Sequence, residues 1–115
     1  RIVSRLEEER FVDEERFCRA FIRDKSLFAK WGKMKIGQAL RLKRIPQSVY
    51  GPLLDDGVDD GEYLSTLRAL LASKRKTIRA RNDYEARAKL VRFALGRGFS
   101  MDDIGRCIDL SGEND

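Results

Sequence analysis

Positive charge is concentrated in one stretch of this chain, residues 73–98. Nine lysines and arginines fall there against two carboxylates, a local charge of +7, whereas the whole chain carries +5. Such a concentration is the usual electrostatic signature of a polyanionic partner such as a nucleic acid. The alternative is a solvated helix face. Together with the basic segment 30–45, this stretch supplies the candidate phosphate-binding residues, which are Lys33, Lys35, Arg41, Lys74, Arg75, Lys76, Arg79, Arg81, Arg87, Lys89 and Arg92.

The residues needed for catalysis or metal binding are largely missing from the sequence. It contains no histidine, which removes the commonest general base and metal ligand. Cys18 and Cys107 are far apart and in no C-x-x-C spacing, so we expect two reduced, apolar fillers. The acidic segment 55–62 (DDGVDDGE) lacks the spacing of a calcium loop, and its adjacent carboxylates make a poor acid–base pair. We therefore expect no enzyme activity, no metal and no cofactor.

Two aromatic residues stand beside the basic segments. Trp31 precedes the first segment and Tyr84 lies inside the second. Either ring could stack on a base of a single-stranded nucleic acid. Both sit near an expected helix junction, however, and packing between helices is the interpretation we favour for each.

Length and composition indicate a small all-α protein. A chain of 115 residues holds one domain or a few small modules that share a core. Hydrophobic residues make up 42% and prolines number only two, a composition that favours helices over strands. No apolar run approaches the ~20 residues that cross a bilayer, and the first residues lack the apolar segment of a signal peptide. We expect an intracellular, cytoplasmic protein with no membrane contact.

Apolar spacing and capping residues divide the chain into short helices. Asp13 is expected to cap a new helix, and Pro46 restarts the chain for a short one. Asp59 and Ser100 are the expected caps of two later helices. Helices are expected over residues 1–11, 13–29, 33–44, 46–55, from 63 through 71, around 90–94, and over 100–110.

The second half of the chain repeats the pattern of the first. Residues 44–55 align with residues 98–109 at an offset of 54. This offset pairs Ile36 with Leu90, Leu40 with Ala94, Tyr50 with Ile104, and Leu54 with Ile108. Farther upstream the offset becomes 46, which pairs Phe17 with Tyr63 and places an insertion of eight residues in the basic run 74–81. The ordered repetition predicts tandem three-helix modules.

Charge follows the same division. Residues 30–45 carry +6 and residues 46–72 carry −4, while residues 73–98 carry +7 and residues 99–115 carry −4. Each repeat is therefore expected to have a basic middle helix and an acidic third helix. We divide the chain into the end of a preceding repeat (1–11), two three-helix repeats (12–57 and 58–110) and a tail (111–115).

Three motifs resemble the RecX family of RecA recombinase regulators. They are the helix VDEERFCRAF at residues 12–21, the pair Ile36-x-x-x-Leu40, and the run from Lys89-Leu90 to the Arg97-Gly98-Phe99-Ser100-x-x-x-Ile104 segment. The likeness covers roughly residues 2–110. One departure is Arg44, where the family pattern and the chain's own second repeat, at Gly98, have glycine after the helix.

The resemblance implies a fold, a function and a set of partners. The fold would be tandem three-helix repeats in an elongated, curved, solenoid-like arrangement, and members usually have three repeats, so this chain is expected to represent part of a longer protein or a truncated member. The function would be binding to RecA filaments on single-stranded DNA and restraint of recombination, by a monomer without catalytic residues. Two other functions remain open from the residues themselves: a general nucleic-acid-binding helical module, and a helical adaptor that binds only protein.

Overall fold

The computed structural model describes the backbone of residues 2–108 and the side chains of residues 12–108. Within that part of the chain all regular structure is helical, as the composition predicts. The helices are α1 (Ile2–Leu27), α2 (Lys33–Leu42), α3 (Gln47–Asp56), α4 (Asp60–Arg75), α5 (Asp83–Gly96) and α6 (Met101–Cys107). The expected tail, and the end of the helix expected over 100–110, lie outside the described residues.

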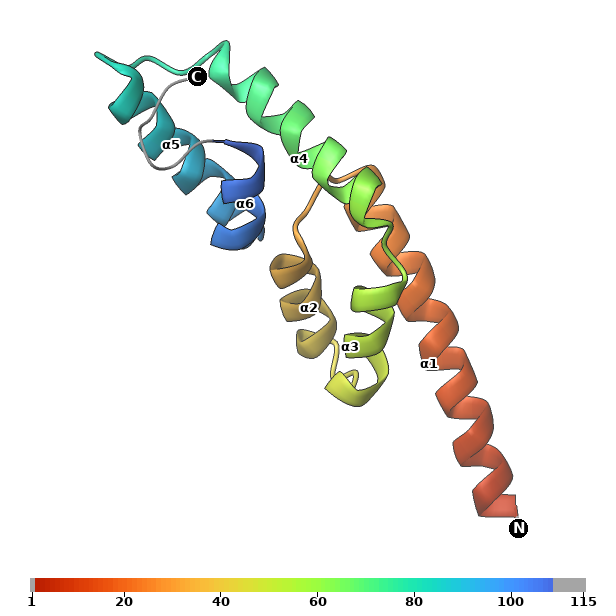
Figure 1. Cartoon of the computed structure of the whole chain (residues 1–115). Helices are drawn as coiled ribbons and strands as arrows, with labels where there is room; N and C mark the ends of the chain where they lie inside the picture. The colour runs from red at the N-terminus through yellow and green to blue at the C-terminus, as the bar shows by residue number, and fades with distance from the viewer. Residues whose placement is uncertain (1, 109–115) are drawn as a thin grey trace.

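These helices form two three-helix bundles placed one after the other. The first module consists of α1, α2 and α3 packed together, and the second of α4, α5 and α6. The molecule is elongated, with extents of 66 × 22 × 21 Å. In Figure 1, α4 continues along the long edge that α1 begins, and the shorter helices lie beside that edge. The predicted architecture of tandem helical modules is confirmed.

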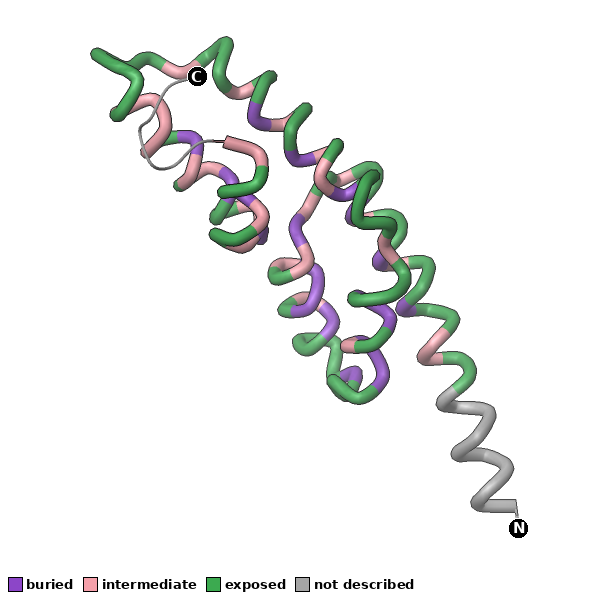
Figure 2. Tube along the Cα trace, in the orientation of Figure 1, coloured by how far each residue is buried: buried purple, intermediate pink, exposed green. Residues whose placement is uncertain are grey.

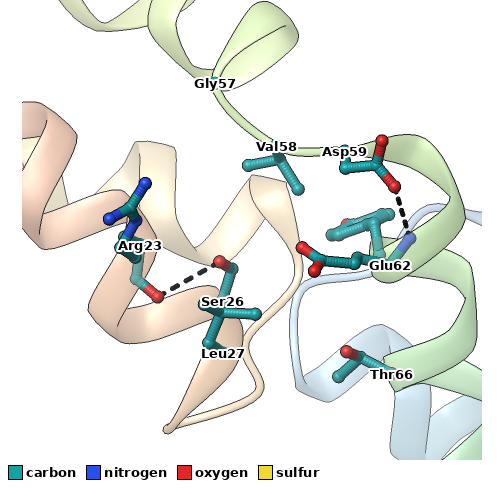
Figure 3. A pocket seen from close by; sticks show the side chains of 9 residues that line it. Arg23, Ser26, Leu27, Gly57, Val58, Asp59, Glu62 and Thr66 are labelled. Atoms are coloured by element: carbon teal, nitrogen blue, oxygen red, sulfur yellow. Dashed lines mark hydrogen bonds between the residues drawn. The ribbon is translucent and has the colours of Figure 1, made fainter.

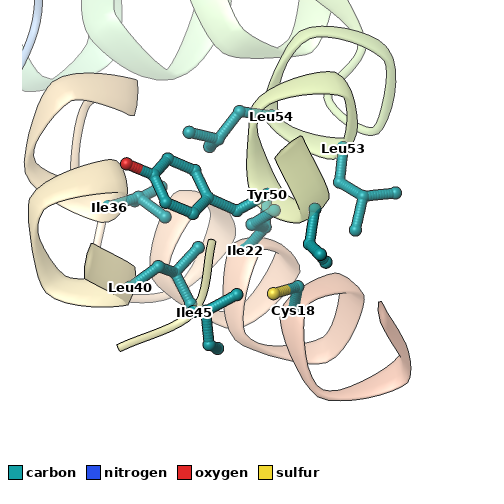
Figure 4. Close-up of a cluster of buried hydrophobic side chains, with 9 residues drawn as sticks. Cys18, Ile22, Ile36, Leu40, Ile45, Tyr50, Leu53 and Leu54 are labelled. Atoms are coloured by element: carbon teal, nitrogen blue, oxygen red, sulfur yellow. The ribbon is translucent and has the colours of Figure 1, made fainter. Parts of the chain in front are cut away.

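Each module has its own hydrophobic core, and the buried positions along the tube in Figure 2 fall in two groups. Figure 4 shows the first core, in which Tyr50 lies against Ile36 and Leu54. The predicted pairs at the offset of 54 agree with the observed burial. All eight side chains belong to the cores, with Ile108 partly buried and the other seven buried. The half-buried Val58 packs against both cores and so links the modules.

The repeat between α1 and α4 is shifted by one residue from the predicted register. The offset of 46 pairs Phe17, which is 45% exposed, with Tyr63, which is 6% exposed. A shift of one residue rotates a helix face by about 100°, so this pairing is wrong. An offset of 45 instead pairs buried residues with buried residues: Cys18 with Tyr63, Ile22 with Leu67, and Ser26 with Leu71. The insertion in the second module is therefore one residue longer than predicted.

Helix α1 is continuous, so the prediction that Asp13 caps a new helix is wrong. Residues 10–14 contain neither glycine nor proline, and nothing in them ends a helix. Asp13 lies on the exposed surface of the helix, where its carboxylate is 3.8 Å from the guanidinium of Arg16. The side chains of residues 1–11 lie outside the described part, and their assignment to a preceding repeat stays a prediction.

Among the helices whose N-cap residue the structure describes, α4, α5 and α6 begin with a side-chain cap. Asp59 and Ser100 each accept a hydrogen bond from the backbone N–H three residues on, at 2.9 and 3.1 Å, as predicted. Asn82 does the same at the start of α5, at 2.8 Å, and this cap was not among those predicted from the sequence. Each cap satisfies one N–H group that the first helical turn leaves without a partner. These caps define where α4, α5 and α6 begin.

Helices α2 and α5 end with the same backbone turn. Ile45 and Phe99 each donate their N–H to the carbonyl five residues earlier, at 3.2 and 3.1 Å. The residue before each of them has a positive φ, +67° at Arg44 and +100° at Gly98. This is the left-handed conformation that glycine adopts most easily. Arg44 therefore keeps the turn in spite of its departure from the family pattern, with a strained backbone.

The two modules meet where the end of α5 contacts the start of α2. The N–H groups of Gly32 and Met34 donate to the carbonyls of residues 97 and 98, at 2.7 and 3.0 Å. The N–H of Lys33 donates to the hydroxyl oxygen of Tyr63 at 2.8 Å. Helix α2 has no side-chain cap of its own. The second module instead satisfies its first N–H groups.

This junction depends on two glycines because backbone lies directly on backbone. A β-carbon at Gly32 would overlap the carbonyl group of Gly98. A β-carbon at Gly98 would lie 2.6 Å from the backbone nitrogen of Lys35. The hydrogen bonds and the absence of intervening side chains fix how the second module sits on the first.

Candidate nucleic-acid interface

The basic run 74–81 forms the end of α4 and the loop that leads to α5. Lys74 and Arg75 lie in the last turn of α4, whereas Lys76, Arg79 and Arg81 lie in the loop. In Figure 1 this loop is at the tip of the molecule opposite the N-terminus. Five of the nine basic residues of segment 73–98 therefore lie before the middle helix, so a basic middle helix does not carry most of the segment's charge as expected. The middle helix α5 begins only after Asn82, whose cap separates it from the loop.

Several contacts hold the loop in place. The side chain of Ile78 packs against the second core. The backbone N–H of Arg81 donates to one carboxylate oxygen of Glu85 at 3.0 Å, and its guanidinium donates to the other at 3.4 Å. The ammonium group of Lys89 donates to the carbonyl oxygen of Arg79. A fixed backbone reduces the conformational entropy that the loop backbone loses when the basic side chains bind a ligand.

The candidate residues of α5 lie on two faces. Arg87 is three residues after Tyr84, which places the two on the same face of the helix. Lys89 and Arg92 are also three residues apart and occupy another face, with Lys89 directed to the loop. Arg87 is half-buried, while Lys89 and Arg92 are exposed.

Three of the candidate lysines lie over aromatic rings. The ammonium groups of Lys33 and Lys35 are 5.0 Å from the ring centre of Tyr63 and 4.6 Å from that of Trp31. Lys74 lies 5.1 Å from the ring of Phe93 in the same way. A cation over a ring face at such distances is attracted by about 0.5–1 kcal/mol. These lysines, all half-buried, contribute to packing as well as to the positive potential.

The structure does not bring all the candidate residues to one place. Lys33 and Lys35 lie at the junction between the modules, and Arg41 is exposed near the end of α2. The remaining eight form what we call the basic tip: the end of α4, the loop and α5. Its members are Lys74, Arg75, Lys76, Arg79, Arg81, Arg87, Lys89 and Arg92.

The two aromatic residues singled out in the sequence have different surroundings. Trp31 is half-buried and packs against the first core, as expected. Tyr84 is 77% exposed, so the expectation that it packs between helices is wrong. It occupies the first turn of α5, whose N-cap lies outside the core. Asn82 is a good N-cap, and this signal could have placed Tyr84 in the first turn of α5, although a cap does not determine whether the next side chains face solvent.

Within the described residues, burial shifts the pKa of three groups, all of them outside the basic tip. Burial raises the pKa of Tyr63 to about 12, against the lowering effect of the hydrogen bond from Lys33. Burial also raises the pKa of the thiols of Cys18 and Cys107. Both cysteines are free, and a raised pKa disfavours the reactive thiolate. Their surroundings agree with the interpretation of apolar fillers.

A hollow of about 420 Å³ lies between the modules on the side away from the basic tip. Figure 3 shows Arg23 and Ser26 of α1 facing Asp59, Glu62 and Thr66 across it. Asp59 is already engaged in capping α4. Among the residues that the structure describes, no group of three or more His, Cys, Asp or Glu is placed to hold a metal ion.

The fold and the tip define a class: a tandem three-helix repeat protein with a basic surface at one end. Sequence models of successive domains match both modules, "RecX, second three-helix domain" over residues 13–50 and "RecX, third three-helix domain" over residues 61–108. The chain belongs to the RecX family. None of the helices between residues 2 and 108 is long and apolar enough to span a bilayer.

Two relatives carry the name Regulatory protein RecX. The chain is 28% identical over 111 residues to the protein of Clostridium acetobutylicum, covering 94% of this chain and 51% of that protein. It is 30% identical over 107 residues to the protein of Vibrio parahaemolyticus serotype O3:K6, covering 93% of this chain and 66% of that protein. The chain thus spans about half the length of the first relative and about two thirds of the second. No solved structure matches it.

Proposed function

We propose that this chain regulates the RecA recombinase in the cytoplasm by binding RecA filaments on single-stranded DNA and restraining recombination. Membership of the RecX family supports a regulatory role. The basic tip supports a contact with the DNA of the filament. The protein acts by binding and carries out no chemistry of its own, so any change that it causes in ATP turnover requires the recombinase.

The observation that carries the proposal is the held loop of the basic tip. Its cations are exposed, and the contacts of Ile78, Glu85 and Lys89 fix the backbone that presents them. Phosphate contacts on a nucleic acid are electrostatic and tolerate any sequence. A regulator that acts along a whole filament needs such a sequence-independent contact. The junction Lys33 and Lys35 add positive charge nearer the middle of the molecule.

The third helix of each module carries exposed acidic residues, and these surfaces are better suited to contact with protein than with DNA. Helix α3 carries Asp55 and Asp56 on its exposed side, and α6 carries Asp102 there. Like charge disfavours their approach to phosphates. We assign the DNA side to the basic tip and the RecA side to surfaces away from it.

The test is binding to RecA on single-stranded DNA, to RecA alone and to DNA alone, over a range of salt. A variant with Lys76, Arg79 and Arg81 changed to alanine should bind the filament more weakly. Each lost phosphate contact lowers the slope of log affinity against log salt by about 0.7, so the slope should fall by up to about 2. Wild-type affinity and slope in this variant would contradict the role of the tip.

A charge-matched control is available on other surfaces. Arg16, Arg19 and Arg106 are exposed and pair with carboxylates of their own helices. Changing these three to alanine removes the same formal charge from the chain and should leave the salt slope unchanged. Equal losses in the two variants would mean that only net charge matters. Tight binding to DNA alone with none added by RecA would favour a general nucleic-acid-binding module instead.

A further inference from the structure

One aromatic ring of the basic tip has no packing role. Tyr84 is 77% exposed, whereas Tyr50 and Tyr63 are 8% and 6% exposed. It lies in the first turn of α5 and contributes to neither hydrophobic core. A single exposed apolar residue is common on protein surfaces and by itself implies nothing. The surroundings of this ring make it different.

Cations stand three residues before and three residues after the ring, while its direct neighbours in the sequence are the carboxylates Asp83 and Glu85. Arg81 precedes it by three residues, and Arg87 follows it by three on the same helix face. The loop before it is tied to α5 through Glu85, which accepts the N–H of Arg81. Asn82 caps the helix immediately before the ring. The ring and its flanking cations are therefore presented on one preformed backbone.

A flat exposed ring with a cation about one helical turn away on either side matches one chemical class of ligand best. Single-stranded nucleic acid has phosphates for the cations and unpaired bases whose faces stack on aromatic side chains. A duplex offers the same phosphates, but its bases are already stacked on one another. An acidic peptide would use the cations and leave the ring without a defined partner.

We propose that Tyr84 is a stacking platform for a base of single-stranded DNA, while neighbouring phosphates contact the loop cations and Arg87. This inference rests on the DNA contact in the proposed function. It adds the aromatic ring that would favour the unpaired bases of a single strand over the stacked bases of a duplex. Stacking on an aromatic ring tolerates all four bases, which suits a protein that binds without regard to sequence.

The chain contains a matched control for the ring. Phe28 is also 77% exposed and also lies beside cations, because it lines a groove with Arg16, Arg19 and Arg23, but it follows α1 and lies outside the basic tip. Its replacement by alanine removes the same kind of exposed aromatic surface. Neither residue belongs to a core, so both alanine variants should remain folded, which circular dichroism can check.

The experiment measures binding of an oligothymidylate and of an abasic oligomer of the same length. Tyr84→Ala should bind the oligothymidylate about 5- to 150-fold more weakly, the range expected for one stacked base. Tyr84→Phe keeps the ring face and should stay near wild type, as should Phe28→Ala. The salt slope should be unchanged in Tyr84→Ala, because no phosphate contact is lost. The abasic oligomer should bind wild type and Tyr84→Ala equally.

Three results would overturn the inference, and they are distinguishable from failure of the proposed function. Equal binding of oligothymidylate by wild type and Tyr84→Ala would mean that no base stacks there. An equal loss with the abasic oligomer would mean that the ring acts through the backbone contact. Absence of oligothymidylate binding by the wild type would overturn the stacking site, while filament binding measured in parallel would decide separately whether the regulatory proposal stands.

Discussion

The two modules have the same three-helix architecture, but their middle helices begin differently. Helix α2 has 10 residues and relies on the second module to satisfy its first N–H groups. Helix α5 has 14 residues and begins with its own cap at Asn82. The first module therefore depends on its neighbour, whereas the start of α5 is free. The inserted basic loop lies at that free end, so the same fold unit makes the contact between modules in one copy and carries the proposed DNA-binding surface in the other.

The largest expected effect comes from filling the junction. Gly98→Ala would place a β-carbon 2.6 Å from the backbone nitrogen of Lys35, at a residue whose φ is +100°. Overpacking and left-handed strain each cost about 1–3 kcal/mol, so the free energy of unfolding should fall by about 3 kcal/mol or more. Urea denaturation followed by circular dichroism measures this. A loss below about 1 kcal/mol would mean that the modules do not meet at this glycine.

High pH should weaken the same junction through Tyr63. Its pKa is raised to about 12, chiefly by burial, from an ordinary value near 10. The unfolded chain therefore releases the phenol proton first as the pH rises. Stability from the neutral phenol is complete below pH ~10 and is lost towards pH ~12, by up to about 3 kcal/mol.

The control for this pH dependence is Tyr63→Phe. It removes the titrating group and also the acceptor of the Lys33 N–H, so it should be less stable at neutral pH by about 1–3 kcal/mol. Between pH 10 and 12 its stability should change less than that of the wild type. Parallel pH curves for the two proteins would show that Tyr63 does not ionise differently in the folded state.

Arg44 occupies the turn after α2 that corresponds to the turn of Gly98 after α5. Here the substitution in the opposite direction, to glycine, can be tested. Its φ of +67° costs a residue with a β-carbon about 1–2 kcal/mol, and its side chain is exposed. Arg44→Gly relieves that strain but gives the unfolded chain more freedom. We expect a net gain of about 1 kcal/mol, visible as a higher melting temperature. A loss of stability would mean that the arginine side chain contributes a contact that outweighs the strain.

The sequence alone predicted those features of the fold that follow from helical periodicity and from local capping chemistry. Tyr50 and Ile104 could be paired because helical spacing repeats on both sides of them, and the caps at Asp59 and Ser100 follow from local chemistry. The junction could not be predicted, since it joins the backbones of Gly32 and Gly98, which are far apart in the sequence and leave no periodic signal.

The sequence predicted which residues of the candidate site carry positive charge, but not how those residues are arranged in space. Counting charges found the basic tip, because net charge needs no conformation. Charge could not separate Lys33, which lies on a ring at the junction, from Arg79, which lies in the loop. The exposure of Tyr84 also escaped the sequence analysis, since an aromatic near a helix start packs in one context and faces solvent in another.

The smallest expected effect separates the fold from the function within the inserted loop. Changing Lys76, Arg79 and Arg81 to alanine should alter the free energy of unfolding by less than about 0.5 kcal/mol, because all three side chains are exposed. Ile78→Ala in the same loop should cost about 1 kcal/mol, since this side chain packs against the second core. Denaturation of both variants beside wild type gives the comparison. If the triple variant lost more stability than Ile78→Ala, the cations would be holding the loop together, and their effect on filament binding would then reflect a disordered loop rather than lost phosphate contacts.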